Sequence, residues 1–86
     1  MDNNFFFEYD PKLLGKLIHD LRKEQGDTQE TLSSKAKLGR THLTTIEAGK
    51  KQIRLDTLWK LAEALDEPPS EILSMYEHII STRHLK

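Results

Sequence analysis

The most informative part of the sequence is TQETLSSKAKLGRTHLTTIEAG, residues 28–49. Leu32 and Ala36 lie four residues apart, and Leu43 and Ile46 lie three apart. This spacing places each pair on one face of a helix, so the stretch predicts two short helices in succession. Both apolar faces are expected to point inward.

Residues that favour helix ends bound both predicted helices. Thr28 is suited to cap the amino terminus of the first and Gly39 that of the second. Gly49 suits a left-handed residue just past the end of the second helix. Only a tight turn fits between Ala36 and Gly39, so the helices must cross at a steep angle. The stretch is therefore expected to form a helix-turn-helix.

The same residues resemble the Cro and lambda-repressor type of DNA-binding domain. The matching features are a Thr-Gln-Glu opening, a small residue at Ser33, Leu-Gly-Arg-Thr entering the second helix, inward Leu43 and Ile46, and Ile-Glu-Ala-Gly-Lys. The likeness runs from about Leu14 to Leu73, and the segment Leu-Gly-Arg-Thr-His-Leu-Thr is similar to the small controller proteins of restriction–modification systems. The resemblance implies an all-α fold, a compact five-helix lambda-repressor-like domain that binds DNA.

Three positions depart from the family pattern. Lys37 stands where the family often has Gly, and a left-handed conformation there costs about 1 kcal/mol. Arg54 replaces the usual Ser or Thr cap, which predicts that the fourth helix begins later, at Asp56. Asp66 replaces a common Gly, and Asp tolerates that backbone region better than most residues do.

Periodicity and caps predict the remaining helices. Asp10 and Pro11 indicate the cap and first residue of a helix that ends at Gly26, and Gly15 within it suggests a close helix contact. The fifth helix is expected over residues 69–83, because Pro is favoured at a first helical position. The inward face of the fourth helix is expected to comprise Ile53, Leu55, Leu58, Leu61, Ala62 and Leu65, with Trp59 at its margin.

Length and composition restrict the class of protein. The 86 residues allow a single domain, residues 1–86, and the absence of Cys excludes disulfides and thiolate zinc sites. His19, His42, His78 and His84 lack metal-binding spacing, so neither a metal nor a cofactor is expected. The chain is not expected to be an enzyme. No apolar run approaches the ~20 residues of a membrane span, so we expect a cytoplasmic protein without membrane contact.

Basic residues are concentrated around the second helix of the motif. The whole chain has a net charge of −1. Residues 35–54 contain six Lys and Arg and one Glu, a net +5, whereas the remainder contains seven basic and thirteen acidic residues, a net −6. One basic face on an acidic body favours a polyanionic partner. A merely solvated charged face is the alternative interpretation.

The outward side chains of the second helix are expected to contact DNA. The amino-terminal end of a recognition helix reaches base edges in the major groove. An Arg there grips guanine O6 and N7, and a Thr touches a thymine methyl or donates a single hydrogen bond. The residues expected to read bases are Arg40, Thr41, Thr44 and Thr45. The residues expected to contact phosphates are Thr28, Gln29, Lys37, His42, Lys50, Lys51 and Arg54.

The family resemblance also assigns structural roles. Gln29 matches a Gln that contacts a phosphate and braces the recognition helix, although a simple first-turn residue is the alternative. An Arg and a Glu at the places of Arg22 and Glu47 form, in the family, a partly buried ion pair joining the first helix to the recognition helix. Removing one partner of a deeply buried pair costs about 3–5 kcal/mol.

Two further segments are expected to make protein contacts. The apolar side chains of residues 70–82 cover an arc of about 160°, wider than the ~100° stripe of a helix packed on one core. We therefore expect a homodimer interface there, with packing of the whole arc into the chain's own core as the alternative. The expected interface residues are Ile72, Met75, Tyr76, Ile79 and Ile80. The amino-terminal arm, residues 1–10, carries the aromatic residues Phe5, Phe6, Phe7 and Tyr9, which are expected to pack on the body, a second subunit or a protein partner.

Two functions are consistent with these features. The first is a homodimeric transcription regulator, such as a repressor, that binds a near-palindromic operator in double-stranded DNA. The second is an antitoxin-like or other protein-interaction module in which DNA binding is secondary. Whether the first kind of protein represses or activates depends on where its operator lies relative to a promoter.

Overall fold

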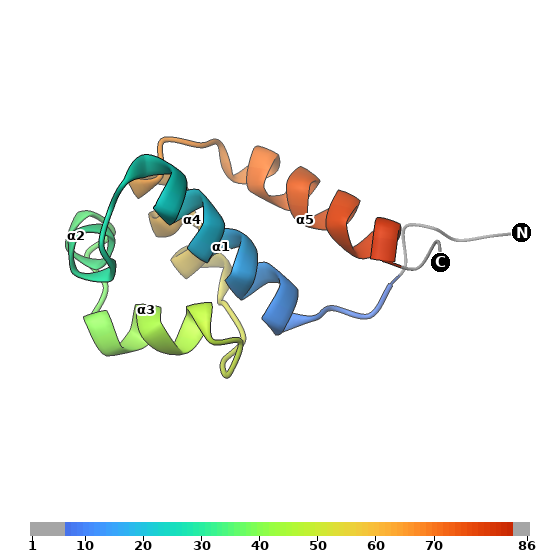
Figure 1. Ribbon diagram of the computed structural model, residues 1–86, viewed down its shortest axis with the longest axis horizontal. Helices are drawn as coiled ribbons and strands as arrows, with labels where there is room; N and C mark the ends of the chain where they lie inside the picture. Colours follow the sequence, from blue (N-terminus) through green and yellow to red (C-terminus); the bar gives the residue numbers. More distant parts are fainter. Residues whose placement is uncertain (1–6, 84–86) are drawn as a thin grey trace, which may run out of the picture.

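Five helices make up most of residues 7–83, the part of the chain that the computed structural model describes (Figure 1). They are α1 (Pro11–Gln25), α2 (Gln29–Lys35), α3 (Arg40–Glu47), α4 (Leu55–Ala64) and α5 (Pro69–Arg83). The expected all-α, five-helix architecture is confirmed. None of these helices is long and apolar enough to cross a membrane.

The helix ends form where the sequence predicts them because capping is a local interaction. Asp10 Oδ1 accepts a hydrogen bond from the backbone N–H of Lys12 at 2.9 Å, at the start of α1. Thr28 Oγ1 accepts one from the N–H of Thr31 at 3.0 Å, at the start of α2. Gly26 ends α1 with a left-handed φ of 78°, a conformation that costs Gly little.

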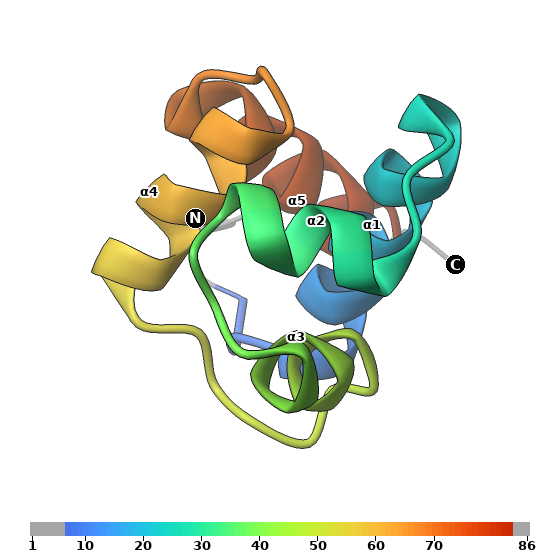
Figure 2. The same cartoon turned by 90° about the vertical axis from the view of Figure 1, so that its left-hand side faces the viewer.

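The turn between α2 and α3 is closed by a left-handed residue. Lys37 has a φ of 57°, as expected, and the N–H of Leu38 donates to the carbonyl of Ser33 at 2.8 Å. Asp66 and Gly49 also have the expected positive φ, 58° and 73°. The view along α2 in Figure 1 shows α3 lying across it, and Figure 2 shows the same pair from the side. The two helices of the motif therefore cross steeply.

The start of α4 differs from the prediction. Arg54 is its N-cap, with φ −73° and ψ 154°, and the Arg54 carbonyl accepts the N–H of Leu58 at 2.9 Å. A start at Asp56 is wrong because that prediction required a side-chain cap, whereas an extended backbone at Arg54 is sufficient. Leu55 is consequently the first helical residue, and it is 66% exposed instead of inward.

Side chains from all five helices form one hydrophobic core. The largest fully buried side chains are Ile18, Leu32, Leu43, Ile46, Leu61 and Ile72. The apolar residues predicted to point inward from the remainder of α4, among them Leu58 and Leu65, are also buried. This core fixes α3 by its apolar face and leaves its opposite face outside.

α3 lies directly against α1 at Gly15. A Cβ atom on Gly15 would collide with the carbonyl oxygen of Ile46 and lie 3.1 Å from that of Glu47. The close helix contact expected at Gly15 is therefore confirmed. It brings the backbones of the two helices together near the carboxyl end of α3.

The start of α1 is tied to α5. The backbone N–H of Asp10 donates to the Tyr76 hydroxyl at 2.7 Å. The Asp10 carboxylate accepts a hydrogen bond from Arg83 at 2.7 Å, and this partner holds the pKa of Asp10 below its usual value. The start of α1 therefore lies against the carboxyl-terminal half of α5.

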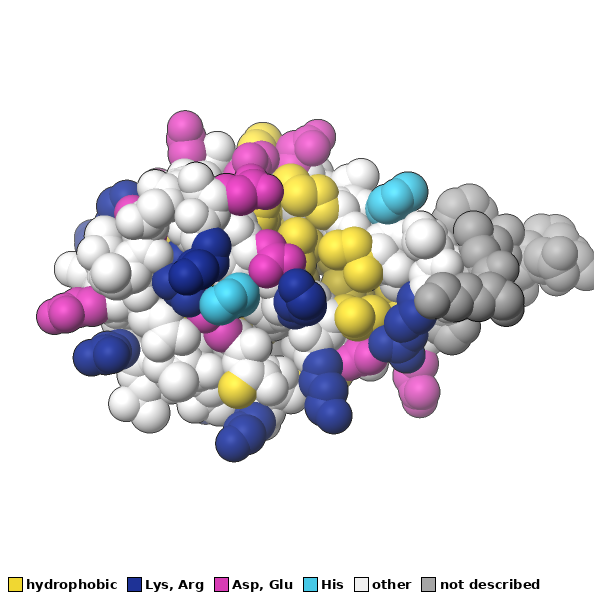
Figure 3. Space-filling model, viewed as in Figure 1, with side chains coloured by type: hydrophobic (Ala, Val, Ile, Leu, Met, Phe, Trp, Pro, Cys, Tyr) yellow, Lys and Arg dark blue, Asp and Glu magenta, His cyan; other side chains and the backbone are white. Residues whose placement is uncertain are grey.

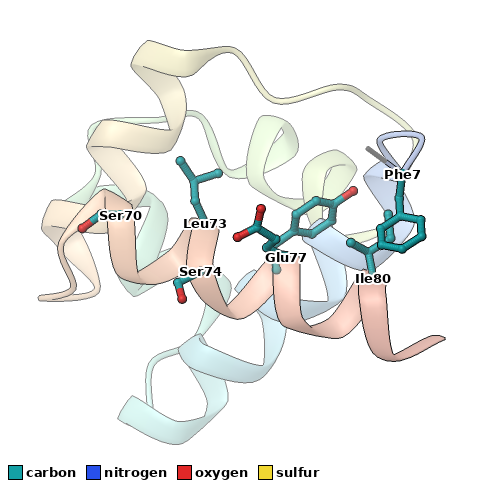
Figure 4. Close-up of a pocket in the computed structure, with 7 residues that line it drawn as sticks. Phe7, Ser70, Leu73, Ser74, Glu77 and Ile80 are labelled. Atoms are coloured by element: carbon teal, nitrogen blue, oxygen red, sulfur yellow. The ribbon is translucent and has the colours of Figure 1, made fainter. Parts of the chain in front are cut away.

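Aromatic residues of the amino-terminal segment pack on the body of the domain. The rings of Tyr9 and Tyr76 lie 5.9 Å apart at 52°, and Phe7 lies beside the carboxyl-terminal half of α5 (Figure 4). Packing of these two aromatics on the body is therefore confirmed. Phe5 and Phe6 lie outside the described residues.

α5 is buried more deeply than its predicted interface role allows. Ile72 and Ile80 are 0% and 4% exposed, so both belong to the interior of the subunit. Their assignment to a dimer surface is wrong because α5 packs against both α1 and α4, which covers Ile72, and Phe7 lies beside Ile80. Met75, Tyr76 and Ile79 are half-buried.

Candidate nucleic-acid interface

α3 separates its apolar and polar side chains onto opposite faces. Leu43 and Ile46 are fully buried, and their three-residue spacing fixes which side of the helix meets the core. The four side chains expected to read bases lie outside the core: Arg40, Thr41 and Thr44 are exposed, and Thr45 is partly exposed. The structure therefore presents them as one polar surface of a single helix.

Arg40 stands at the amino-terminal end of this surface. It is the first residue of α3, after the N-cap Gly39, and its guanidinium makes no hydrogen bond or ion pair within residues 7–83. No acidic side chain lies in the first turn of α3. The positive end of the helix dipole is therefore not neutralised there, which favours an approaching anion.

Exposed basic side chains flank both ends of α3. Lys37 lies in the turn before the helix, and Lys50 and Lys51 lie in the loop after it. Figure 3 shows Lys and Arg side chains projecting from the edge formed by α3 and this loop. Arg54 is also exposed, and its Nε forms a solvent-exposed ion pair with Asp56 Oδ1 at 3.3 Å.

Two of the predicted phosphate-contacting residues, Thr28 and His42, are partly engaged within the subunit. The Thr28 hydroxyl caps α2 and donates to the Thr31 hydroxyl at 3.0 Å. His42 lies on α3 and is half-buried. Their phosphate contacts stay predictions.

Arg22 and Glu47 form the ion pair that the family resemblance implies. Arg22 Nε donates to Glu47 Oε2 at 2.7 Å, and Nη2 donates to Oε1 at 3.0 Å. The two side chains are only 8% and 4% exposed, so the pair joins α1 to the end of α3 almost out of contact with water. Arg22 Nη1 also donates to the Asp27 carbonyl at 2.8 Å, which anchors the loop before α2.

Gln29 connects this ion pair to the outer face of α3. Its Nε2 donates to Glu47 Oε1 at 3.0 Å, and its Oε1 accepts from the Thr44 hydroxyl at 3.0 Å. His19 Nδ1 lies 3.1 Å from Glu47 Oε1 and 3.2 Å from Arg22 Nη2. Residue spacing alone does not identify His19 or Thr44 as members of this network. The signal for His19 is its place one turn before Arg22 on α1.

The carboxylate at the centre of the network is held in its charged form. Burial opposes the charge on Glu47, but hydrogen bonds from Arg22, Gln29 and His19 outweigh it, so the pKa of Glu47 lies below its ordinary value. The hydrogen bond to Glu47 correspondingly raises the pKa of Arg22. Both residues are therefore charged near neutral pH.

Apolar side chains are exposed or half-buried at several places on the described part of the subunit, among them the following two. Hydrophobic side chains gather along the seam between α1 and α5 (Figure 3), beside a groove of about 460 Å³. The groove is lined by Leu17, Ser74, Met75, His78 and Ile79. The other surface lies at the start of α4, where Leu55 and the 53% exposed Trp59 border a hollow of about 640 Å³. Residue spacing alone does not predict this second surface, because it places Leu55 on the inward face of α4.

Within residues 7–83 the histidines are not gathered into a metal site. The described part of the chain holds no group of three or more His, Asp or Glu side chains placed to bind a metal ion. His19 instead serves the buried network, and His84 lies outside the residues that the structure describes.

Comparisons with known proteins agree with the helix-turn-helix fold described above. The helix-turn-helix family model matches residues 18–72. The chain is 32% identical over 63 residues to an uncharacterised HTH-type transcriptional regulator, y4dJ, from Sinorhizobium fredii, a match that covers 73% of this chain and 82% of the relative. Among solved structures it is similar to the restriction–modification controller protein C.AhdI from Aeromonas hydrophila, with 35% identity, a TM-score of 0.71, and coverage of 73% of this chain and 96% of that one.

The fold also matches a relative solved on DNA. The restriction–modification controller protein C.Esp1396I, a tetramer in complex with its natural 35 base-pair operator, gives a TM-score of 0.74 at 24% identity over 81% of this chain and 92% of its own. The match to the family model includes both helices of the motif and the residues of the buried network. The chain therefore belongs to the helix-turn-helix family of DNA-binding transcription regulators, of the Cro and lambda-repressor type.

Proposed function

We propose that this protein is a sequence-specific regulator of transcription that binds a near-palindromic operator in double-stranded DNA as a homodimer. The observation that carries the proposal is the outer face of α3, where Arg40 is exposed at the amino-terminal end of the helix. The opposite face of α3 is fixed to the core and to α1. A rigidly held helix with a cationic amino end fits the major groove.

The proposed contacts with DNA divide into base contacts and phosphate contacts. Base readout is assigned to Arg40, Thr41, Thr44 and Thr45, with Arg40 bidentate to a guanine. Phosphate contacts are assigned to the side chains around them: Thr28, Gln29, Lys37, His42, Lys50, Lys51 and Arg54. Phosphate contacts fix the register of the protein on the duplex, and base contacts select the sequence. The protein then acts in the cytoplasm, where it meets its operator.

The second subunit is assigned to the outer side of α5. With Ile72 and Ile80 buried, Met75 and Ile79 are left half-buried beside the groove against α1, and Tyr76 is left half-buried beside Phe7. An isologous contact about a two-fold axis is the commonest way to bury such a surface. It sets two recognition helices about one DNA turn apart, roughly 34 Å, and so requires a near-palindromic operator. The tetrameric operator complex of C.Esp1396I supports an oligomeric DNA-bound state.

A protein-interaction role, antitoxin-like or otherwise, is the second candidate. It is favoured by the apolar hollow of about 460 Å³ that Phe7 forms with Leu73, Tyr76 and Ile80 on α5 (Figure 4). Tyr9 beside it is 40% exposed. An exposed apolar surface of this kind suits a partner protein, with DNA binding then secondary.

Selection of bound sequences from a random pool of double-stranded DNA, with the full chain, tests the proposal. We expect two half-sites related by a two-fold axis. With about four phosphate contacts per subunit, log K should fall against log salt with a slope of roughly −7, since each neutralised phosphate contributes ~0.9. Three results together would establish the protein-interaction role instead. They are the absence of an enriched sequence, a slope of log K against log salt near zero, and a stable heteromer purified from the native host.

A further inference from the structure

The network behind α3 fixes the direction of each hydrogen bond. Arg22 can only donate, and the ionised carboxylate of Glu47 can only accept. Gln29 must therefore turn its amide nitrogen toward Glu47, where the distance is 3.0 Å. The amide oxygen then faces the other way, and the Thr44 hydroxyl must donate to it across 3.0 Å. The chain of donors runs from the surface of α3 toward the buried carboxylate.

The reverse orientation of the Gln29 amide is not available. It would place the amide oxygen 3.0 Å from Glu47 Oε1, two acceptors in contact, at a carboxylate that is only 4% exposed. The lowered pKa of Glu47 keeps that carboxylate from becoming a donor near neutral pH. Thr44 Oγ1 also lies 3.0 Å from the carbonyl of Arg40, a second acceptor inside the protein. The hydroxyl hydrogen of Thr44 is therefore used within the subunit, whether it points to Gln29 Oε1 or to the Arg40 carbonyl.

The three threonines of α3 differ in this respect. The Thr45 hydroxyl donates only to the carbonyl of Thr41 one turn back, at 2.8 Å, a bond that any helical Thr can make. The Thr41 hydroxyl has no hydrogen-bond partner in the part of the chain that the structure describes, so it is free to donate to DNA. Among the contacts that residues 7–83 make, Thr44 alone of the three is held by a side chain from another helix, Gln29 of α2.

Because the Thr44 hydroxyl is held by partners inside the subunit, the methyl group is the part of this side chain that is left to contact DNA. Thr44 is exposed on the face of α3 assigned to the major groove. The apolar feature that the major groove offers to such a group is the C5 methyl of thymine. We propose that Thr44 reads a thymine methyl in each half-site, and that Gln29 is the positioning residue that fixes it in this orientation. This inference rests on the proposed function and names the base feature that this position selects.

Replacement of thymine by uracil tests the inference, because it removes the methyl group and leaves the hydrogen-bonding edge unchanged. In the operator obtained by selection, each thymine is replaced in turn, and affinity of the full chain is measured. We expect one position per half-site at which uracil weakens binding by about fourfold, the effect of one buried methyl. Thr44→Val retains a methyl and should retain this penalty, whereas Thr44→Ser should lose it. Thr41→Ser is the matched control and should retain it.

The positioning role of Gln29 is tested by a separate measurement of the thymine and uracil operator affinities. Gln29→Ala should reduce the ratio between the thymine and uracil affinities, because the Thr44 hydroxyl then keeps only its bond to the Arg40 carbonyl and is held less firmly. If Gln29→Ala weakens both operators equally, Gln29 acts only on the phosphate backbone and its positioning role is wrong. If uracil has no effect at any position, or if Thr44→Ser keeps the penalty, Thr44 does not read a methyl group. In each of these cases a selected operator still exists, so the outcome is distinct from failure of the proposed function, in which no operator is enriched.

Discussion

Arg22 on α1 and Glu47 on α3 are joined by two hydrogen bonds of 2.7 and 3.0 Å in a region nearly closed to water. The two residues are 25 positions apart in sequence, and the pair is the main polar link between the first helix and the helix assigned to the major groove. The orientation of α3 therefore depends on a charged contact. We therefore expect stability and DNA binding to be coupled through it.

Arg22→Ala is expected to lower the free energy of unfolding by about 3–5 kcal/mol, because Glu47 stays buried without its partner. DNA affinity should fall as well, since α3 loses its attachment to α1. Urea denaturation and DNA titration measure the two effects. The matched control is Lys16→Ala, which removes a solvent-exposed ion pair to Asp20 on the same helix and should cost no more than about 1 kcal/mol. A folded Arg22→Ala protein with unchanged melting temperature and DNA affinity would contradict the role of this pair in holding α3 to α1.

Glu47 also makes stability depend on pH. Burial raises the pKa of Glu47, but the hydrogen bonds from Arg22, Gln29 and His19 together lower it by more than burial raises it. The folded pKa therefore lies below the unfolded value of about 4.3. The stabilising contribution is complete above the unfolded pKa and is lost as pH falls through the folded pKa. The loss of stability caused by Glu47→Gln should therefore be smaller at about pH 3 than at pH 7. Equal losses in denaturation at the two pH values contradict the assignment.

Gly15→Ala tests the contact between α1 and α3. In an open helix this change stabilises by about 1 kcal/mol. Here the new Cβ meets the carbonyl oxygen of Ile46, so we expect a destabilisation of about 1–3 kcal/mol in thermal or chemical denaturation. At Gly39 a Cβ meets nothing within 4 Å, and Gly39→Ala should change stability by less than about 1 kcal/mol. A more stable Gly15→Ala protein would show that the helices are farther apart.

Ile79→Asp tests the assignment of the dimer contact to α5. Ile79 is half-buried beside the groove between α1 and α5, so a charge there should give a folded monomer with much reduced operator affinity. Analytical ultracentrifugation at micromolar concentration measures the oligomeric state. Leu55→Asp places the same charge on the other apolar surface and should leave the dimer intact. The opposite pattern, a monomer from Leu55→Asp only, moves the interface to α4.

The helix-turn-helix was predictable from sequence because its signals are local. Thr28 caps a helix through the N–H three residues later, and Lys37 and Gly49 adopt left-handed conformations that the turn geometry requires. The start of α4 was not predictable in this way. An N-cap that relies on backbone conformation alone, as at Arg54, leaves no side-chain signal, and the orientation of Leu55 follows from that start.

The finer parts of the site depend on the packing of several helices. The network from Arg22 to Thr44 requires α1, α2 and α3 to meet, so residue spacing on one helix does not reveal it. The burial of Ile72 likewise follows from the docking of α5 on two neighbours, and Phe7 lies beside the buried Ile80. Periodicity indicates that a helix has a wide apolar arc, but it does not say which part of the arc the chain itself covers.

The most direct test of DNA recognition by α3 is selection from a random DNA pool with the wild-type protein, Arg40→Ala and Lys51→Ala side by side. Because Arg40 is assigned to a base and Lys51 to a phosphate, Arg40→Ala should lose discrimination at one position of each half-site, by roughly 1–3 kcal/mol. Lys51→Ala should weaken all sequences alike and leave the preferred site unchanged. An Arg40→Ala protein that selects the same site with the same discrimination as wild type would contradict the assignment of α3 as the recognition helix.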